Sequence, residues 1–314
     1  MNLYTRYLDP KNDLSFKKIF GSEKHKNIPI DFLNAVLELQ EGNQIVDLEF
    51  LNTQDPPEIA ARKESIVDVL VRDQKGIKYV VEMQVSKVEG FEKRAQYYAA
   101  KTYCAHFGKA GKYRDLKQVI FLAVTDYIVF PDKKDRYKSA HIILDNKTYE
   151  HDLKDFSFTF VELPKFQKTL QELQTIEERW YYFLKHADTS HDIESIIANH
   201  PHIKEAYEVL DRFHWTEAEI EFYEKISLDI EDRQGIAIAA RKDGLKEGRQ
   251  EGRQEGRQEG RQEGRQEGLK EGLEKGRREN QEKIARALLE EGLTLEKIET
   301  ITGLSVQEIQ SLET

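Results

Sequence analysis

The stretch that decides the fold is Ile66-Val67-Asp68-Val69-Leu70-Val71-Arg72-Asp73-Gln74-Lys75-Gly76-Ile77-Lys78-Tyr79-Val80-Val81-Glu82-Met83-Gln84-Val85. Two runs rich in Val and Ile, 63–72 and 77–85, flank the turn Asp73-Gln74-Lys75-Gly76, a pattern that predicts a β-hairpin. Residues two apart share one face of a strand, so Glu82 and Gln84 are expected side by side. Because an antiparallel neighbour can bring Asp68 across to that face, the hairpin predicts two carboxylates and an amide at one sheet edge.

Each of these acids stands inside an otherwise apolar strand, where a carboxylate is costly to bury without a partner. Magnesium takes oxygen ligands, usually one or two carboxylates together with water and phosphate oxygens. Asp68 and Glu82 are therefore candidate metal ligands, and Gln84 is a candidate for orienting a water molecule or a phosphate. On these residues alone, a salt bridge within the hairpin or plain charges at a sheet edge remain open.

The rest of the first 190 residues carries alternating helix and strand signals, which indicate an α/β sandwich. Residues 191–240 have apolar positions at helical spacing and predict a helical extension. Outside the hairpin, helices are expected at 13–20, 30–39 and 88–107, and strands at 44–51, 119–124, 140–144 and 156–163.

Composition narrows the class of protein. The single cysteine, Cys104, excludes an internal disulfide and makes cysteine metal sites implausible. No apolar run reaches the roughly 18 residues of a membrane span, and the first residues lack a signal-peptide pattern, so a cytoplasmic protein is expected. Although the net charge is −10, residues 91–141 carry eleven Lys and Arg against five acids. This basic zone fits a phosphate-binding face, with a solvated surface as the alternative.

One predicted helix face adds candidates for substrate binding. Arg94, Tyr97, Tyr98 and Lys101 follow the i, i+3, i+4, i+7 spacing that places residues on one side of a helix. Arg94, Tyr98 and Lys101 are therefore candidates for holding a phosphodiester; the alternative is that the tyrosines are core and the cations rim the surface. Asp13 is a candidate third metal ligand, with the helix N-cap as the alternative.

From Gly244 to Gly276 a glycine recurs every fourth residue, and five consecutive units read Gly-Arg-Gln-Glu. Glycine weakens a helix by about 1 kcal/mol per site relative to Ala, and like charges fall at i and i+4. A flexible linker is therefore favoured. A helix whose glycine stripe serves self-association, for instance in a coiled coil, is the other reading.

The last residues, 279–314, predict three short helices. Thr294 is a candidate cap, Ser305 and Glu308 form a capping-box pattern, and Gly292 and Gly303 stand at the breaks, an arrangement that resembles a helix-turn-helix. This segment has eight acids and three bases. Since phosphate contacts dominate affinity for DNA, a protein-interaction or packing module is favoured over a DNA reader.

Asp68 followed by Glu82-x-Gln84 resembles the bipartite signature of PD-(D/E)XK nucleases, with Val67 in place of the usual Pro and Gln84 in place of the usual Lys. Further motifs resemble the Rpn/transposase-like branch of that family, the recombination-promoting nucleases and related transposases. They are Asp13-x-x-Phe16-Lys17-x-x-Phe20-Gly21, Phe32-Leu33-Asn34-Ala35-Val36-Leu37, Arg94-x-x-Tyr97-Tyr98-x-x-Lys101-x-Tyr103, Phe160-x-Glu162-Leu163-x-Lys165-Phe166 and Trp180-x-x-Phe183-Leu184.

The resemblance implies a restriction-endonuclease-like α/β core, a mixed central sheet flanked by helices, followed by a helical region and tail. It implies a Mg²⁺-dependent DNA endonuclease, with Mn²⁺ as a substitute ion and a link to recombination or mobile elements. Asp68, Glu82 and Gln84 are then the catalytic residues. The expected domains are a nuclease-like domain at 1–190, a helical extension at 191–240, the repeat at 241–278 and a small helical module at 279–314.

Two other functions remain open. The first is a weak or inactive nuclease-fold scaffold that forms homo-oligomers through the repeat, since Gln84 lacks the charge of a lysine. The second is a transcriptional regulator that uses the terminal helices.

Overall fold

The computed structural model describes residues 5–51, 67–105, 112–189, 193–198 and 200–312. The chain divides into two compact units, Met1–Ile236 and Ala237–Thr314. The first unit contains α1 (Asp13–Phe20), α2 (Asn27–Val36), β1 (Leu48–Phe50), β2 (Val69–Asp73), β3 (Lys78–Gln84), α3 (Phe91–Cys104), β4 (Val119–Thr125), β5 (Lys138–Ile142), β6 (Phe156–Glu162), α4 (Ile176–His186), α5 (Ile193–Ile197), α6 (Pro201–Leu210) and the start of α7 (Glu217–Glu290).

Within the described residues, six strands form one mixed sheet in the order β1-β2-β3-β4-β6-β5. The central strands β3, β4 and β6 run parallel, and the outer pairings are antiparallel. The hairpin is confirmed: Val69 lies opposite Val81, and the N–H of Gly76, at φ +84°, donates to the Asp73 carbonyl at 3.0 Å. The expected restriction-endonuclease-like α/β fold is therefore present, and the carboxyl ends of β3, β4 and β6 meet at one edge.

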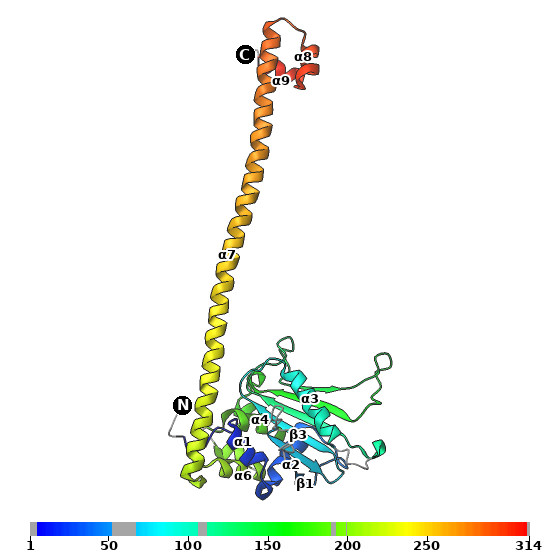
Figure 1. Cartoon of the computed structure of the whole chain (residues 1–314), viewed down its shortest axis with the longest axis vertical. Coiled ribbons are helices and arrows are strands. Elements are labelled where there is room, and N and C mark those ends of the chain that lie inside the picture. The colour runs from blue at the N-terminus through cyan, green and yellow to red at the C-terminus, as the bar shows by residue number, and fades with distance from the viewer. Residues whose placement is uncertain (1–4, 52–66, 106–111, 190–192, 199, 313–314) are drawn as a thin grey trace. The chain divides into compact units, whose positions relative to one another are not determined.

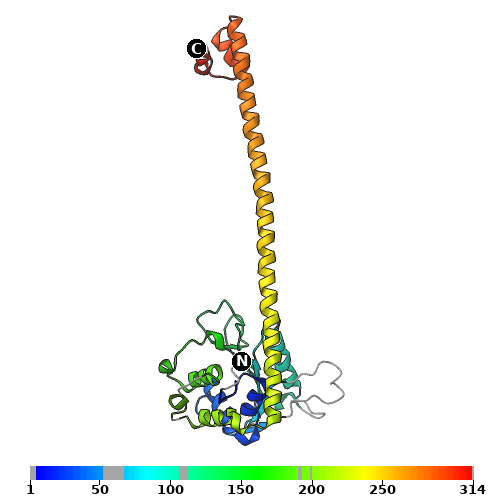
Figure 2. The same ribbon diagram turned by 90° about the vertical axis from the view of Figure 1, so that its left-hand side faces the viewer.

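Two apolar layers cover the sheet, and their composition fixes which way each strand residue points. On one face α1, α2, α4 and α6 form the larger core, in which Phe32 packs against Trp180 with ring centroids 5.6 Å apart. On the other face α3 packs Phe91 and two alanines against β4 and β6 (Figures 1 and 2). Val80 belongs to this second core, so alternation along β3 directs Glu82 toward α3 as well.

All the expected elements of the first unit exist, with shifts that have local causes. The strand predicted at 44–51 is confined to β1, because the Asn34 side chain takes up both backbone groups of Ile45, at 2.9 and 2.8 Å. The helix predicted from residue 88 begins at Phe91, since Gly90 precedes it in the left-handed region at φ +71°. The part of the first hairpin run at 63–66 lies outside the described residues.

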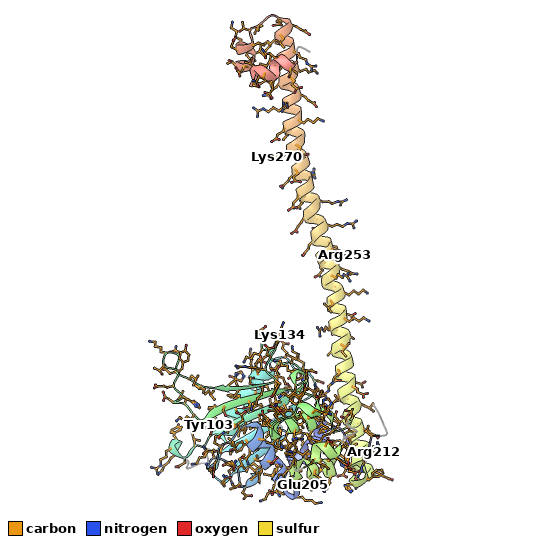
Figure 3. The ribbon with its side chains drawn as sticks, turned by 180° about the vertical axis from the view of Figure 1, so that it is seen from behind. Tyr103, Lys134, Glu205, Arg212, Arg253 and Lys270 are labelled. Atoms are coloured by element: carbon orange, nitrogen blue, oxygen red, sulfur yellow. The ribbon has the colours of Figure 1, made fainter. Side chains whose placement is uncertain are left out.

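The glycine repeat is helical, so the favoured prediction of a flexible linker is wrong. Helix α7 continues through every Gly-Arg-Gln-Glu unit, although residues 235–280 are all exposed; Figure 3 shows the side chains along it, among them Arg253 and Lys270. Starting a helix is costly whereas extending one is cheap, and both flanks of the repeat are helical already. Arg, Gln and Glu are good helix formers, which offsets part of the cost of glycine.

The second unit ends in a small module in which α8 (Leu295–Thr302) and α9 (Val306–Ser311) pack with the end of α7. Its core contains Ala285, Ile298, Leu304 and Ile309. The capping box of Ser305 and Glu308 is confirmed, and the breaks occur at glycines with positive φ. Thr294 occupies the N-cap position of α8, but its side chain makes no capping hydrogen bond. None of the helices in the described part of the chain is long and apolar enough to cross a membrane.

Candidate active site

Asp68 directly precedes β2, and its carboxylate extends the pairing of the hairpin beyond the last paired residues. The N–H of Met83 donates to Asp68 Oδ2 at 2.8 Å. The carboxylate therefore stands where a strand carbonyl would continue the ladder, which fixes its position at the end of β3. Its side chain is 11% exposed, so Oδ1 remains near the protein surface while Oδ2 is held by the backbone.

Glu82 is the most deeply buried of the three predicted catalytic residues, at 2% exposure. Gln84 Nε2 donates to Glu82 Oε2 at 3.1 Å, which confirms that the two side chains share a face. Glu82 Oε1 is also buried but has no hydrogen-bond partner within the described part of the chain. A buried carboxylate oxygen without a partner is costly, and its environment suits a cation.

The electrostatics of this pair are unfavourable for two negative charges. Burial raises the pKa of Asp68 to about 6, and the charge of Asp13 adds to the rise against the opposing Met83 N–H and Lys17. Burial, with the added repulsion of Asp68, raises the pKa of Glu82 to about 8, against the opposing effects of Arg94 and Gln84. Two carboxyl groups so placed favour a bound cation or a bound proton.

The α3 face lies beside Glu82. The Arg94 guanidinium sits over the rings of Phe91 and Tyr98, 5.1 and 5.8 Å from their centroids, and its buried Nε has no partner in the described residues. Tyr98 is half-buried, and burial raises the pKa of its hydroxyl although the charge of Arg94 opposes the rise. The alternative that the tyrosines are core is wrong for Tyr97, which is 60% exposed. Lys101 is half-buried on the same helix.

The basic zone of residues 91–141 is only partly available to a ligand. Lys138 forms ion pairs with Glu38 and Glu177, each at 2.7 Å, so its charge is taken up within the protein. Lys109 lies outside the described residues. The exposed cations of the zone include Lys93, Lys112, Arg114, Lys133, Lys134 and Arg136.

Asp13 is the first residue of α1 rather than its cap. The cap is Asn12, whose side chain accepts from Leu14 N at 3.0 Å, so the N-cap alternative for Asp13 is wrong. Although Asp13 is exposed, partial desolvation raises its pKa against the lowering effect of Lys17 and Arg233. It lies near enough to raise the pKa of Asp68. Within the described residues, however, no three His, Cys, Asp or Glu side chains are grouped so that they could hold a metal ion.

Sequence reasoning missed Lys17 as a site residue, although it stands in one of the quoted motifs. Its Nζ lies 3.6 Å from Asp68 Oδ1. The signal was the spacing Asp13-x-x-x-Lys17, one helical turn, which puts the two charged groups on one face of α1. Neither residue type nor spacing shows that this face meets the end of β2.

Glu162, at the corresponding edge of β6, has a structural role. It is 1% exposed, accepts from the N–H groups of Val129 and Phe130 at 2.7 and 3.0 Å, and pairs with Lys165 at 2.8 Å. The quoted Glu162–Lys165 motif therefore fastens a loop rather than adding to the carboxylate pair. The aromatic residues Phe166, Trp180 and Phe183 are buried in the larger core.

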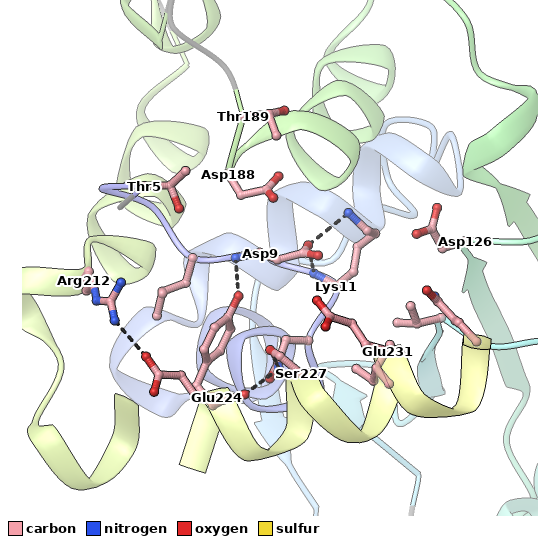
Figure 4. Close-up of a pocket in the computed structure, with 16 residues that line it drawn as sticks. Thr5, Asp9, Lys11, Asp126, Asp188, Thr189, Arg212, Glu224, Ser227 and Glu231 are labelled. Atoms are coloured by element: carbon pink, nitrogen blue, oxygen red, sulfur yellow. Dashed lines mark hydrogen bonds and ion pairs between the residues drawn. The ribbon is translucent and has the colours of Figure 1, made fainter. Parts of the chain in front are cut away.

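A separate cavity of about 320 Å³ opens between the N-terminal segment and the start of α7. In it Lys11 pairs with Asp9 at 3.0 Å and lies among the carboxylates of Asp126 and Asp188 (Figure 4). Burial lowers the pKa of Lys11, but Asp9 and Asp126 outweigh it and the pKa is raised. The lysine thus balances this acidic group internally.

A mixed sheet with a buried carboxylate pair at the end of its central hairpin defines the class of PD-(D/E)XK nucleases. The sequence matches the PD-(D/E)XK nuclease family transposases over residues 10–237, and the chain belongs to that family. Residues 278–314 match the C-terminal helix-turn-helix domain of the Rpn/YhgA-like nuclease family, which confirms the helix-turn-helix likeness of the terminal module. No curated protein and no solved structure matches the chain.

Proposed function

We propose that the chain is a Mg²⁺-dependent DNA endonuclease, with Mn²⁺ as a substitute ion, that acts in recombination or on mobile elements. The observation that carries this proposal is Glu82 Oε1, a buried carboxylate oxygen that has no hydrogen-bond partner among the described residues and lies beside a second carboxylate. Hard oxygen donors of this kind fit a divalent cation, and family membership supports a nuclease. Asp68 and Glu82 would hold the ion, and Asp13 is a third candidate ligand.

The roles of the protein groups follow from their contacts. The backbone of Met83 fixes Asp68, and Gln84 fixes one oxygen of Glu82, so that the other oxygen is left for the ion. A divalent cation bound there supplies positive charge against the phosphate and makes an attacking water more acidic. Arg94 and Lys101, with the hydroxyl of Tyr98, would bind the phosphates on the α3 side.

Nicking of supercoiled plasmid DNA by the full-length protein tests this function. We expect cleavage with Mg²⁺ or Mn²⁺ and none with EDTA. Asp68→Asn should lower the rate at least about 100-fold, since loss of a metal ligand removes several kcal/mol of charge stabilisation. Asp135→Asn, at an exposed acid of the basic zone, serves as the matched control. Equal rates for wild type and Asp68→Asn would exclude this site as the catalyst.

A second candidate function is a nuclease-fold scaffold that forms homo-oligomers through α7. The observation in its favour is the repeat, where every residue is exposed and a Cβ added to any glycine would meet nothing within 4 Å. Among the residues that the structure describes, nothing of the same chain therefore packs on the stripe. Sedimentation of the full chain, together with the nicking assay, distinguishes the two candidate functions. The scaffold is supported if the wild-type protein forms an oligomer but does not cleave DNA, and if Asp68→Asn forms the same oligomer.

A further inference from the structure

The candidate site lacks a cation at the position where the family signature has a lysine. Gln84 carries no charge, and its Nε2 is already engaged by Glu82 Oε2 at 3.1 Å. Nuclease chemistry builds negative charge on the phosphate, and a positioned cation stabilises that charge. The α3 side offers Arg94, but its guanidinium is partly buried over two aromatic rings.

Lys17 brings an ammonium group to the opposite side of the pair. Its Nζ is 3.6 Å from Asp68 Oδ1, a distance of ionic contact rather than of a hydrogen bond. The side chain is 42% exposed, so the ammonium group faces Asp68 and solvent together. A phosphate approaching the Asp68 carboxylate from solvent would therefore meet it.

The position of Lys17 is fixed by the helix that carries it. Phe16, Ile19 and Phe20 of α1 are buried in the larger core. The cap residue Asn12 is tied to α7, donating to the Tyr223 carbonyl at 3.3 Å and to Ser227 Oγ at 2.9 Å. The backbone at Lys17 is thus held in place. The neighbouring Lys18 points elsewhere, with its ammonium group 2.6 Å from Glu219 and over the ring of Trp215.

We infer that Lys17 binds the reacting phosphate and supplies, from α1, the positive charge that Gln84 does not provide. This inference rests on the proposed nuclease function. It assigns Lys17 as a substrate-contacting residue and Gln84 as the residue that positions Glu82.

The test compares Lys17→Gln with Lys17→Arg, with Lys18→Gln as the matched control on the same helix, and with the double variant Lys17→Gln/Gln84→Lys. We expect Lys17→Gln to lower kcat for plasmid nicking about 100-fold, the range found when one stabilising donor is removed. Lys17→Arg and the double variant should recover part of that loss, because each restores a cation near the phosphate. If Lys17 only supported the fold, a lysine introduced at residue 84 would not restore the lost activity.

Binding gives a second readout that does not depend on cleavage. With Ca²⁺ in place of Mg²⁺, the salt dependence of duplex DNA affinity, followed by fluorescence anisotropy, should decrease by about one phosphate contact in Lys17→Gln and remain unchanged in Lys18→Gln. Thermal unfolding measured in parallel separates a folding defect from a lost contact.

The inference is overturned if Lys17→Gln retains wild-type kcat and wild-type salt dependence, or if Lys18→Gln loses as much of either. If the wild type does not nick DNA under any metal condition, the proposed function fails. The salt dependence then still decides whether Lys17 contacts phosphate.

Discussion

The carboxylate pair and the glycine repeat differ in where their charged side chains lie: those of the pair are buried, and those of the repeat are exposed to solvent. At the hairpin, Glu82 is 2% exposed, and the surroundings raise its pKa to about 8. Along α7, every Arg and Glu from 235 to 280 is exposed to solvent. Since water screens exposed charges, the repeat tolerates its like-charge spacing. The pair has no such screening, so its charges must be balanced by a bound ion or proton.

The largest expected effect is that of Glu82→Gln, which should lower the rate of plasmid nicking at least about 100-fold. The same substitution should stabilise the metal-free protein against unfolding at alkaline pH. The folded protein keeps protons on Glu82 and Asp68 that the unfolded chain releases at lower pH. The free energy of unfolding therefore falls as pH rises from the normal carboxyl range through about 6 and then about 8.

Thermal unfolding between about pH 5 and about pH 9 measures this decline in stability. Glu82→Gln should largely remove the decline, although the charged groups of Lys17, Arg94 and Asp13 still surround the site. Adding Mg²⁺ at alkaline pH should stabilise the wild type and not the variant. Glu92→Gln, at an exposed acid on α3, is the matched control. A pH profile of Glu82→Gln that coincides with the wild type would contradict the electrostatic account.

Next in size is the contrast between core and repeat truncations. Phe32 is fully buried between Phe20 and Trp180, so Phe32→Ala should lower the free energy of unfolding by about 3–5 kcal/mol. Arg253 is exposed on α7, and Arg253→Ala should change it by less than about 0.5 kcal/mol. Urea unfolding measures both. A comparable loss in the two variants would mean that the repeat contributes packing in the protein as it exists in solution.

A smaller effect is expected at Asn12, which caps α1 and ties it to α7. Asn12→Ala should cost about 1–2 kcal/mol. Asn12→Asp keeps an oxygen for the cap but loses the amide donors to Tyr223 and Ser227, so its loss should be intermediate. Urea unfolding of the three proteins checks the order, and an alanine variant as stable as the wild type would disprove the role of the cap.

The smallest effects concern glycine, where the sign should differ between the two regions. Gly76 has φ +84°, and a Cβ there would touch Lys117 Cγ at 3.4 Å, so Gly76→Ala should destabilise by about 1 kcal/mol. A Cβ at Gly256 meets open space, so Gly256→Ala should instead stabilise the helix by about 1 kcal/mol. Thermal unfolding followed by circular dichroism measures both. If Gly256→Ala also weakens self-association, the stripe packs against a second chain.

The sequence predicted the hairpin, its turn and the shared face of Glu82 and Gln84, because strand alternation and a glycine-bearing turn are local properties. It also predicted most element positions. It misjudged the repeat because helix propagation from both flanks outweighs the local cost of glycine. Asn12 rather than Asp13 caps α1, and a one-residue shift of this kind is invisible to composition.

Contacts between distant segments were beyond sequence reasoning. The approach of Lys17 to Asp68 depends on how α1 packs on the larger core, and the pairing of Lys138 with Glu38 and Glu177 depends on β5 lying at the sheet edge. The charge count of the basic zone therefore overstated the free cations. The hairpin pattern was enough to single out Asp68, Glu82 and Gln84 as candidates. The burial of Glu82 Oε1 without a hydrogen-bond partner in the described part of the chain could be seen only in the structure.

The hydrogen bond from Met83 N–H to Asp68 Oδ2 bears on which substitutions a chain of this family can tolerate once its activity is lost. Loss of the acceptor at residue 68 would unpair a backbone donor at the end of β3, so a folded chain needs Asp or Asn there whether or not it is active. Glu82 differs, because its buried charge costs free energy in the fold and, under the proposed function, is retained for the metal ion that it would hold. Under the proposed function, a neutral residue at the position of Glu82 in a related chain would therefore indicate an inactive copy, whereas an intact Asp68 would not by itself indicate an active one.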